Sequence, residues 1–131
     1  MNNSIIDPGI PYIGPIRTKL IPGSTITIEG TVPSAAYEFN INLQCGSQTT
    51  PQDDIAIQIT VKLLDGYIAL NSLENGVWGV EQRMLSLPIK RAEKFHVVLL
   101  CGLSRFTVCI SYLITSAGLP QAHFFSLFKN N

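Results

Sequence analysis

IAIQITVKL, the stretch from Ile55 to Leu63, alternates large apolar residues with smaller or polar ones. Successive side chains of a β-strand point to opposite faces, so a period of two residues predicts a strand with one buried and one solvent-facing side. Gln58, Thr60 and Lys62 then share the solvent-facing side of that strand.

Further strand candidates surround this stretch. The same alternation recurs at 37–45, and shorter candidates lie at 25–31, 66–71, 95–101 and 105–112. Asp65-Gly66 predicts a two-residue hairpin turn and Asn75-Gly76 a second tight turn, because glycine tolerates positive φ. No window of about eleven residues shows the helical period, so the residues predict an all-β protein, an antiparallel sandwich or barrel.

Length and composition limit the classes of function. The chain has 131 residues, of which 46% are hydrophobic and 14% charged, and its formal net charge is zero. The length fits one domain, expected at 16–131 after an extended lead-in at 1–15. A neutral chain has no basic field to attract nucleic acid or anionic lipid. The most apolar run, Val97 to Leu100, is too short for membrane insertion.

The N-terminus lacks the basic and apolar stretches of a secretory signal, which predicts a cytoplasmic protein. Cys45, Cys101 and Cys109 are odd in number, which favours thiols in a reducing compartment over a disulfide framework. Each is expected to be a small buried apolar residue.

The residues offer no catalytic constellation. His96 and His123 lie in different segments, and the alternation around His96 places it on the outer side of a strand. No Cys/His cluster has metal-ligand spacing, and no glycine-rich loop opens a helix. We therefore expect neither an enzyme nor a cofactor or metal site.

The informative polar residues lie between positions 58 and 83. The predicted hairpins bring them to one sheet face, which would gather Gln58, Thr60, Lys62, Asn71, Trp78, Glu81 and Arg83. Amides and paired charges orient hydroxyl groups, and an indole ring stacks on apolar C–H groups, so such a face suits a sugar. The alternative is that Trp78 only packs against its neighbours and that Glu81 and Arg83 form a surface ion pair worth under about 1 kcal/mol.

These residues resemble the sugar-binding signature of galectins. The signature residues are Asn71-Ser72, Gly76-Val77-Trp78-Gly79 and Glu81-Gln82-Arg83, and the likeness extends roughly from Pro22 to Ile110. The resemblance implies a two-sheet, jelly-roll-like (concanavalin/galectin-type) sandwich that binds β-galactosides without metal. It further implies that Asn71 and Glu81 bind the primary hydroxyl of the sugar, that Trp78 stacks on galactose, and that Arg83 braces Glu81 and reaches the second sugar.

One strand departs from the galectin pattern. Where the family carries a "H.NPR" strand that reads the axial hydroxyl of galactose, this chain has Gln58, Thr60, Val61 and Lys62. Threonine is shorter than asparagine, and lysine lacks the planar fork of arginine. Losing two polar contacts of about 1–3 kcal/mol each weakens binding by roughly 30- to 10⁴-fold.

The tail at 111–131 does not look like the family's C-terminal strands. Its apolar cluster is expected to form one strand or a short helix, and comprises Phe124, Phe125, Leu127 and Phe128. A missing strand would leave a sheet edge open and favour a homodimer or a protein partner.

Two functions follow from these observations. The first is a galectin-type lectin that binds β-galactoside-like glycans weakly or with altered specificity, located in the cytoplasm and, as the resemblance implies, able to leave cells without a signal peptide. The alternative is a galectin-related protein-interaction module that has lost sugar binding.

Overall fold

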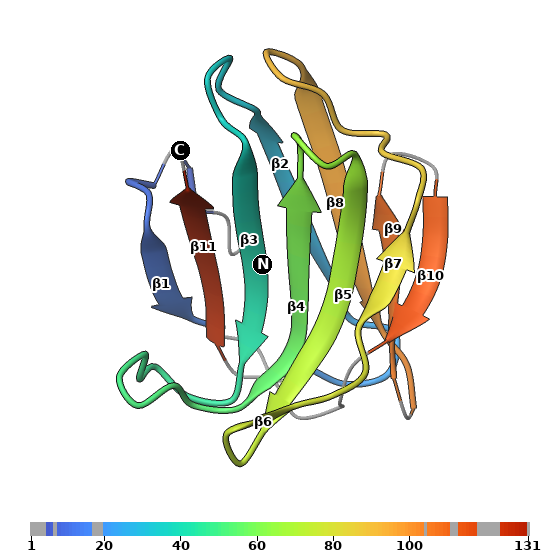
Figure 1. The fold of residues 1–131 in the computed structure, drawn as a ribbon. Helices are drawn as coiled ribbons and strands as arrows, with labels where there is room; N and C mark the ends of the chain where they lie inside the picture. The colour runs from blue at the N-terminus through green and yellow to red at the C-terminus, as the bar shows by residue number, and fades with distance from the viewer. Residues whose placement is uncertain are drawn as a thin grey trace.

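Two antiparallel sheets pack face to face in the computed structural model of the chain. The structure describes residues 5–6, 8–16, 20–103, 105–110, 113–117 and 124–130, so His123 lies outside the described residues. Within these ranges every regular element is a strand, and none is a helix that could cross a membrane. Figure 1 shows the seven-stranded sheet in front of the four-stranded sheet. The predicted all-β sandwich is confirmed.

The seven-stranded sheet has the order β1-β11-β3-β4-β5-β6, and β7 also pairs with β5. Its strands are β1 (Tyr12–Pro15), β3 (Glu38–Gln44), β4 (Ile55–Lys62), β5 (Tyr67–Glu74), β6 (Val77–Trp78), β7 (Gln82–Met84) and β11 (Phe124–Asn130). The four-stranded sheet has the order β10-β9-β8-β2. Its strands are β2 (Thr25–Thr31), β8 (Lys94–Cys101), β9 (Phe106–Ile110) and β10 (Leu113–Ala117).

The core lies between the two sheets and follows the alternation of β4. Ile57, Ile59 and Val61 are fully buried, whereas Gln58, Thr60 and Lys62 on the opposite side are partly exposed. The four-stranded sheet contributes buried side chains that include Val97, Leu99, Phe106 and Val108. Each such side chain stabilises the fold by about 1.5–3 kcal/mol relative to an exposed one. The apolar side of β4 thus directs its polar side away from the core.

The two predicted turns have different outcomes. Asn75 and Gly76 join β5 to β6 as a two-residue turn with φ of 51° and 77°, which confirms the prediction. The two-residue turn at Asp65-Gly66 is wrong, because four residues, 63–66, separate β4 from β5. The Gly66 N–H donates a hydrogen bond to the Lys62 carbonyl at 2.8 Å. The φ of 80° at this position favours glycine over residues with a side chain.

Both ends of the chain contribute strands to the sandwich. Residues 12–15 of the expected lead-in form β1, which pairs with β11. The apolar cluster of the tail forms one strand, β11, which is one of its two expected forms and lies between β1 and β3. The tail also contains a second strand that was not expected, β10, which pairs with β9. Strand β11 is therefore an interior strand of its sheet (Figure 1). The tail strand β11 pairs with β3, so the tail does not leave β3 as an open edge.

None of the three cysteines forms a disulfide. Cys101 is buried in the core, as predicted, whereas Cys45 and Cys109 are only partly buried. Burial raises the pKa of the Cys45 thiol above its usual value, and the negative charges of Asp54 and Asp53 raise it further. A higher pKa keeps this thiol protonated and unreactive near neutral pH.

Candidate functional site

Six of the seven predicted site residues lie on four neighbouring strands of the seven-stranded sheet, and Glu81 lies just before β7. Gln58 is opposite Asn71 in the β4–β5 ladder, and Arg83 on β7 is opposite Ala69 on β5. Trp78 on β6 is opposite Leu73. Residues 69, 71 and 73 share one side of β5 because they are two apart. We call this surface, from β3 to β7, the polar face.

Glu81 and Arg83 form one end of the polar face. The Arg83 Nε atom donates a hydrogen bond to Glu81 Oε2 at 2.7 Å, which confirms the predicted pairing. The guanidinium group also lies over the Tyr67 ring, 4.3 Å from its centroid. Two contacts therefore hold Arg83 in one orientation, although the pair itself is exposed and contributes little to stability.

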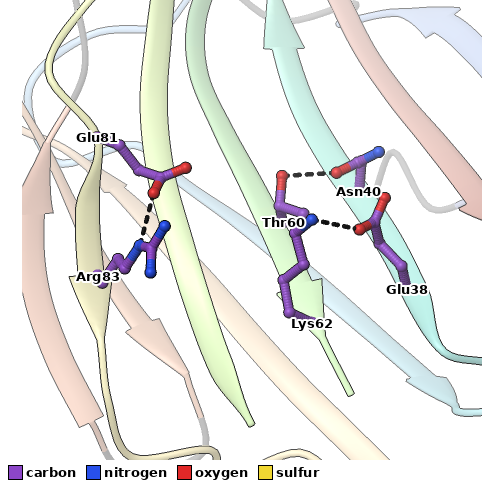
Figure 2. A network of polar contacts seen from close by, with 6 residues as sticks. All are labelled: Glu38, Asn40, Thr60, Lys62, Glu81 and Arg83. Atoms are coloured by element: carbon purple, nitrogen blue, oxygen red, sulfur yellow. Dashed lines mark hydrogen bonds and ion pairs between the residues drawn. The ribbon is translucent and has the colours of Figure 1, made fainter. Parts of the chain in front are cut away.

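The polar side chains of β4 bond to the neighbouring strand β3. Lys62 Nζ lies 2.7 Å from Glu38 Oε1, and the Thr60 hydroxyl donates to Asn40 Oδ1 at 2.6 Å. Figure 2 shows these two contacts together on the β3 side of the face, separate from the Glu81–Arg83 pair. The side chains of Thr60 and Lys62 are thus already engaged within the protein.

Glu38 and Asn40 were missed as members of the site. Their strand was expected from its alternation, and Glu38, Asn40 and Asn42 form a row of polar residues on one side of it. The register places Glu38 opposite Lys62 and Asn40 opposite Thr60. The row of polar residues in the sequence indicated a polar side for this strand. It did not show which residues of β4 they face, because the ten residues between the two strands do not determine the register.

A buried acceptor lies next to these contacts. Asn42 is only 3% exposed, and its Oδ1 atom has no hydrogen-bond partner among the described residues. Asn42 is opposite Gln58 in the ladder. An unsatisfied buried acceptor costs about 1–3 kcal/mol, so this position favours a nearby donor such as the amide of Gln58.

Asn71 presents its amide NH₂ group as a donor. Its Oδ1 atom accepts a hydrogen bond from the Ser72 N–H at 2.8 Å. Gly79 lies close to this residue pair, because its N–H donates a hydrogen bond to the Ser72 carbonyl at 2.9 Å. Beside it, Trp78 is 47% exposed, which leaves one part of the indole ring open to solvent. The face thus offers a fixed donor, an exposed aromatic ring and a braced carboxylate.

Gly79→Ala tests the packing against Asn71. A Cβ atom at position 79 would lie 3.2 Å from Asn71 Oδ1 and 3.3 Å from Ser72 Oγ, which is tighter than ordinary contacts. We expect the amide of Asn71 to shift by a few tenths of an ångström and the affinity for a ligand bound through this amide to fall about 3- to 10-fold, with a stability change below about 1 kcal/mol. Calorimetric titration and urea unfolding measure the two effects, and unchanged affinity would show that Asn71 does not contact the ligand.

The opposite sheet carries a separate hollow. It is lined by Glu29, Gly30, Thr31, Lys94, Phe95, His96 and Cys109. His96 is half exposed, as predicted for the outer side of its strand, and its Nε2 atom lies 3.5 Å from Glu29 Oε1. None of the seven predicted site residues borders this hollow.

Comparisons with known proteins point to one family. Residues 11–112 match the family model described as galactoside-binding lectin. Human galectin-4 is 36% identical over 103 residues, which cover 78% of this chain and 31% of galectin-4. The 32 kDa beta-galactoside-binding lectin of Haemonchus contortus is 32% identical over 101 residues, which cover 77% of this chain and 35% of that lectin.

A solved structure has the same fold. Sheep galectin-11, in a complex with glycerol, superposes with a TM-score of 0.80 at 16% identity, covering 94% of this chain and 92% of the other. The chain spans about a third of the length of the curated relatives that it matches. The family match covers most of the chain and includes every residue of the polar face, so the chain belongs to the galectin family of galactoside-binding lectins.

Proposed function

We propose that the polar face binds a neutral, β-galactoside-like glycan, without metal or cofactor, and does so weakly or with altered specificity. The observation that carries the proposal is the half-exposed ring of Trp78 beside the Asn71 amide and the Glu81–Arg83 pair. An exposed ring between fixed polar groups can stack on the C–H groups of a sugar while its neighbours bind the hydroxyls. Membership in a family of lectins supports binding rather than catalysis.

The roles proposed for the residues follow from their hydrogen-bonding groups. Asn71 donates to a sugar hydroxyl through its NH₂ group, because its oxygen is engaged by Ser72. Glu81 accepts from a hydroxyl through the oxygen that does not bond Arg83 Nε, and Arg83 donates to a second sugar unit through its remaining N–H groups. Gln58, at the same level as Asn71 in the ladder, can both donate and accept.

The contacts of β4 support weak or altered binding. The Thr60 hydroxyl already donates its hydrogen bond to Asn40, so toward a ligand it can act only as an acceptor. The Lys62 ammonium bonds Glu38. A ligand that needs these two groups must compete with short internal contacts, which supports the roughly 30- to 10⁴-fold loss of affinity expected for two missing polar contacts.

A lactose titration followed by intrinsic fluorescence tests the proposal. Trp78 is the chain's sole tryptophan, so a change in emission reports on this position. We expect saturable quenching or a blue shift with a dissociation constant in the millimolar range, and a weaker response to a mannoside of equal size. No response up to tens of millimolar lactose, together with no signal on a glycan array, would refute the proposal.

Changing β4 toward the galectin pattern should strengthen binding. In the triple variant Gln58→His, Thr60→Asn, Lys62→Arg, we expect lactose to bind at least about 30-fold more tightly, because two polar contacts are regained. Isothermal titration calorimetry measures the gain. Adding Trp78→Ala to the triple variant should remove it, and a triple variant no stronger than the unmodified protein would contradict the role given to β4.

The engagement of Thr60 and Lys62 within the protein also favours one alternative, an interaction module that has lost sugar binding. Co-purification of a protein partner that is insensitive both to Trp78→Ala and to excess lactose would support it. Deleting the tail does not test this alternative, because β11 is an interior strand and its loss would disrupt the sheet. From family membership we also propose that the protein acts in the cytoplasm, or outside the cell after export without a signal peptide.

A further inference from the structure

The polar face holds its two cations in separate ion pairs. Lys62 bonds Glu38 across the β3–β4 ladder, with side chains that are 31% and 22% exposed, and Arg83 bonds Glu81. In Figure 2 the two pairs lie apart, and the Lys62 ammonium points toward Glu38 on β3. Each cation therefore has its own carboxylate.

The charges around the face sum to a small negative value. The cations are Lys62 and Arg83, the paired anions are Glu38 and Glu81, and Asp65 in the β4–β5 turn acts electrostatically on both cations. The hydrogen bond that Lys62 donates to Glu38 is the largest cause that raises the pKa of Lys62, so the ammonium group stays charged throughout the neutral range. A partly buried pair is also screened by salt less than an exposed one. An anionic ligand would meet no uncompensated positive charge among these groups.

We propose that Glu38 is a specificity-determining residue, which holds Lys62 against β3 and thereby makes the face select neutral glycans over sulfated or sialylated ones. This inference rests on the proposed function of the face. Glu38 acts through Lys62 rather than by touching the sugar, so it is a positioning residue. Removing the charge of Glu38 while keeping its shape leaves the Lys62 ammonium group without a compensating anion, so that it can attract an anionic substituent.

The first test compares lactose with lactose sulfated at the 3′ or 6′ hydroxyl, by fluorescence titration of three proteins. The unmodified protein should bind lactose at least as tightly as either sulfated form. In Glu38→Gln, the ratio of the affinities, sulfated to neutral, should rise about tenfold for at least one sulfated form, and the rise should shrink at 1 M salt. Glu29→Gln is the matched control, because it removes the same charge from the other sheet, where Glu29 contacts His96.

An unchanged ratio in Glu38→Gln, or an equal rise in Glu29→Gln, would overturn the inference. So would an unmodified protein that already prefers the sulfated sugar.

A second test needs no sugar. Inorganic sulfate is titrated while NMR follows the side-chain resonances of Lys62, which should move in Glu38→Gln and stay nearly unchanged in the unmodified protein. Equal movement in both proteins would overturn the role of Glu38. If no protein binds lactose, the proposed function fails, and the sulfate titration alone decides whether Glu38 masks Lys62.

Discussion

Trp78→Ala is expected to weaken lactose binding at least about 30-fold, equivalent to roughly 2 kcal/mol, because truncating a central aromatic contact removes a large share of the binding energy. The ring is 47% exposed and sits on the short edge strand β6, so the loss of folding stability should be only about 1–2 kcal/mol. Because the variant lacks the fluorophore, calorimetry measures its affinity and circular dichroism in urea its stability.

Trp78→Phe is the control for this experiment. It keeps an aromatic surface and should retain part of the affinity, between the unmodified protein and Trp78→Ala. If Trp78→Ala and the unmodified protein bind lactose with equal affinity, the sugar does not bind at Trp78.

Phe106→Ala is expected to lower the free energy of unfolding by about 3–5 kcal/mol, a large part of the 5–15 kcal/mol typical of a domain. Phe106 is 1% exposed and lies on β9, opposite Cys101 of β8. Truncating it opens a cavity between the sheets. Urea unfolding measures the loss, and lactose affinity below the transition should not change, because Phe106 faces the core.

Leu103→Ala is the matched control for Phe106→Ala. Leu103 lies three residues earlier and is 89% exposed, so its truncation should change stability by less than about 0.5 kcal/mol. A loss below about 1 kcal/mol for Phe106→Ala would contradict the assignment of this residue to the core.

The faces of individual strands could be predicted from the sequence. In β4 the alternation is regular from Ile57 to Lys62, so a one-residue shift would expose three buried side chains, and the predicted sides of Gln58, Thr60 and Lys62 are the observed ones. The turn at Asn75-Gly76 could be predicted because few residue pairs accept two positive φ values. Both features depend on short-range stereochemistry.

Features that join distant segments could not be predicted in this way. Strand β11 inserts between β1 and β3, which lie about 110 and about 85 residues earlier, and no local pattern encodes such a pairing. The pair between Glu38 and Lys62 depends on the β3–β4 register in the same way. The resemblance identified the residues of the family signature, but Glu38 and Asn40 lie outside it and needed the structure.

Residue-level NMR mapping of lactose binding tests the central claim most directly. On adding lactose to the isotope-labelled protein, the indole N–H of Trp78, the side-chain amide of Asn71 and the Nε–H of Arg83 should shift together along one binding curve. Signals of Glu29 and His96 on the opposite sheet should stay in place. Shifts confined to the opposite sheet, or none at tens of millimolar lactose, would contradict a sugar site on the polar face.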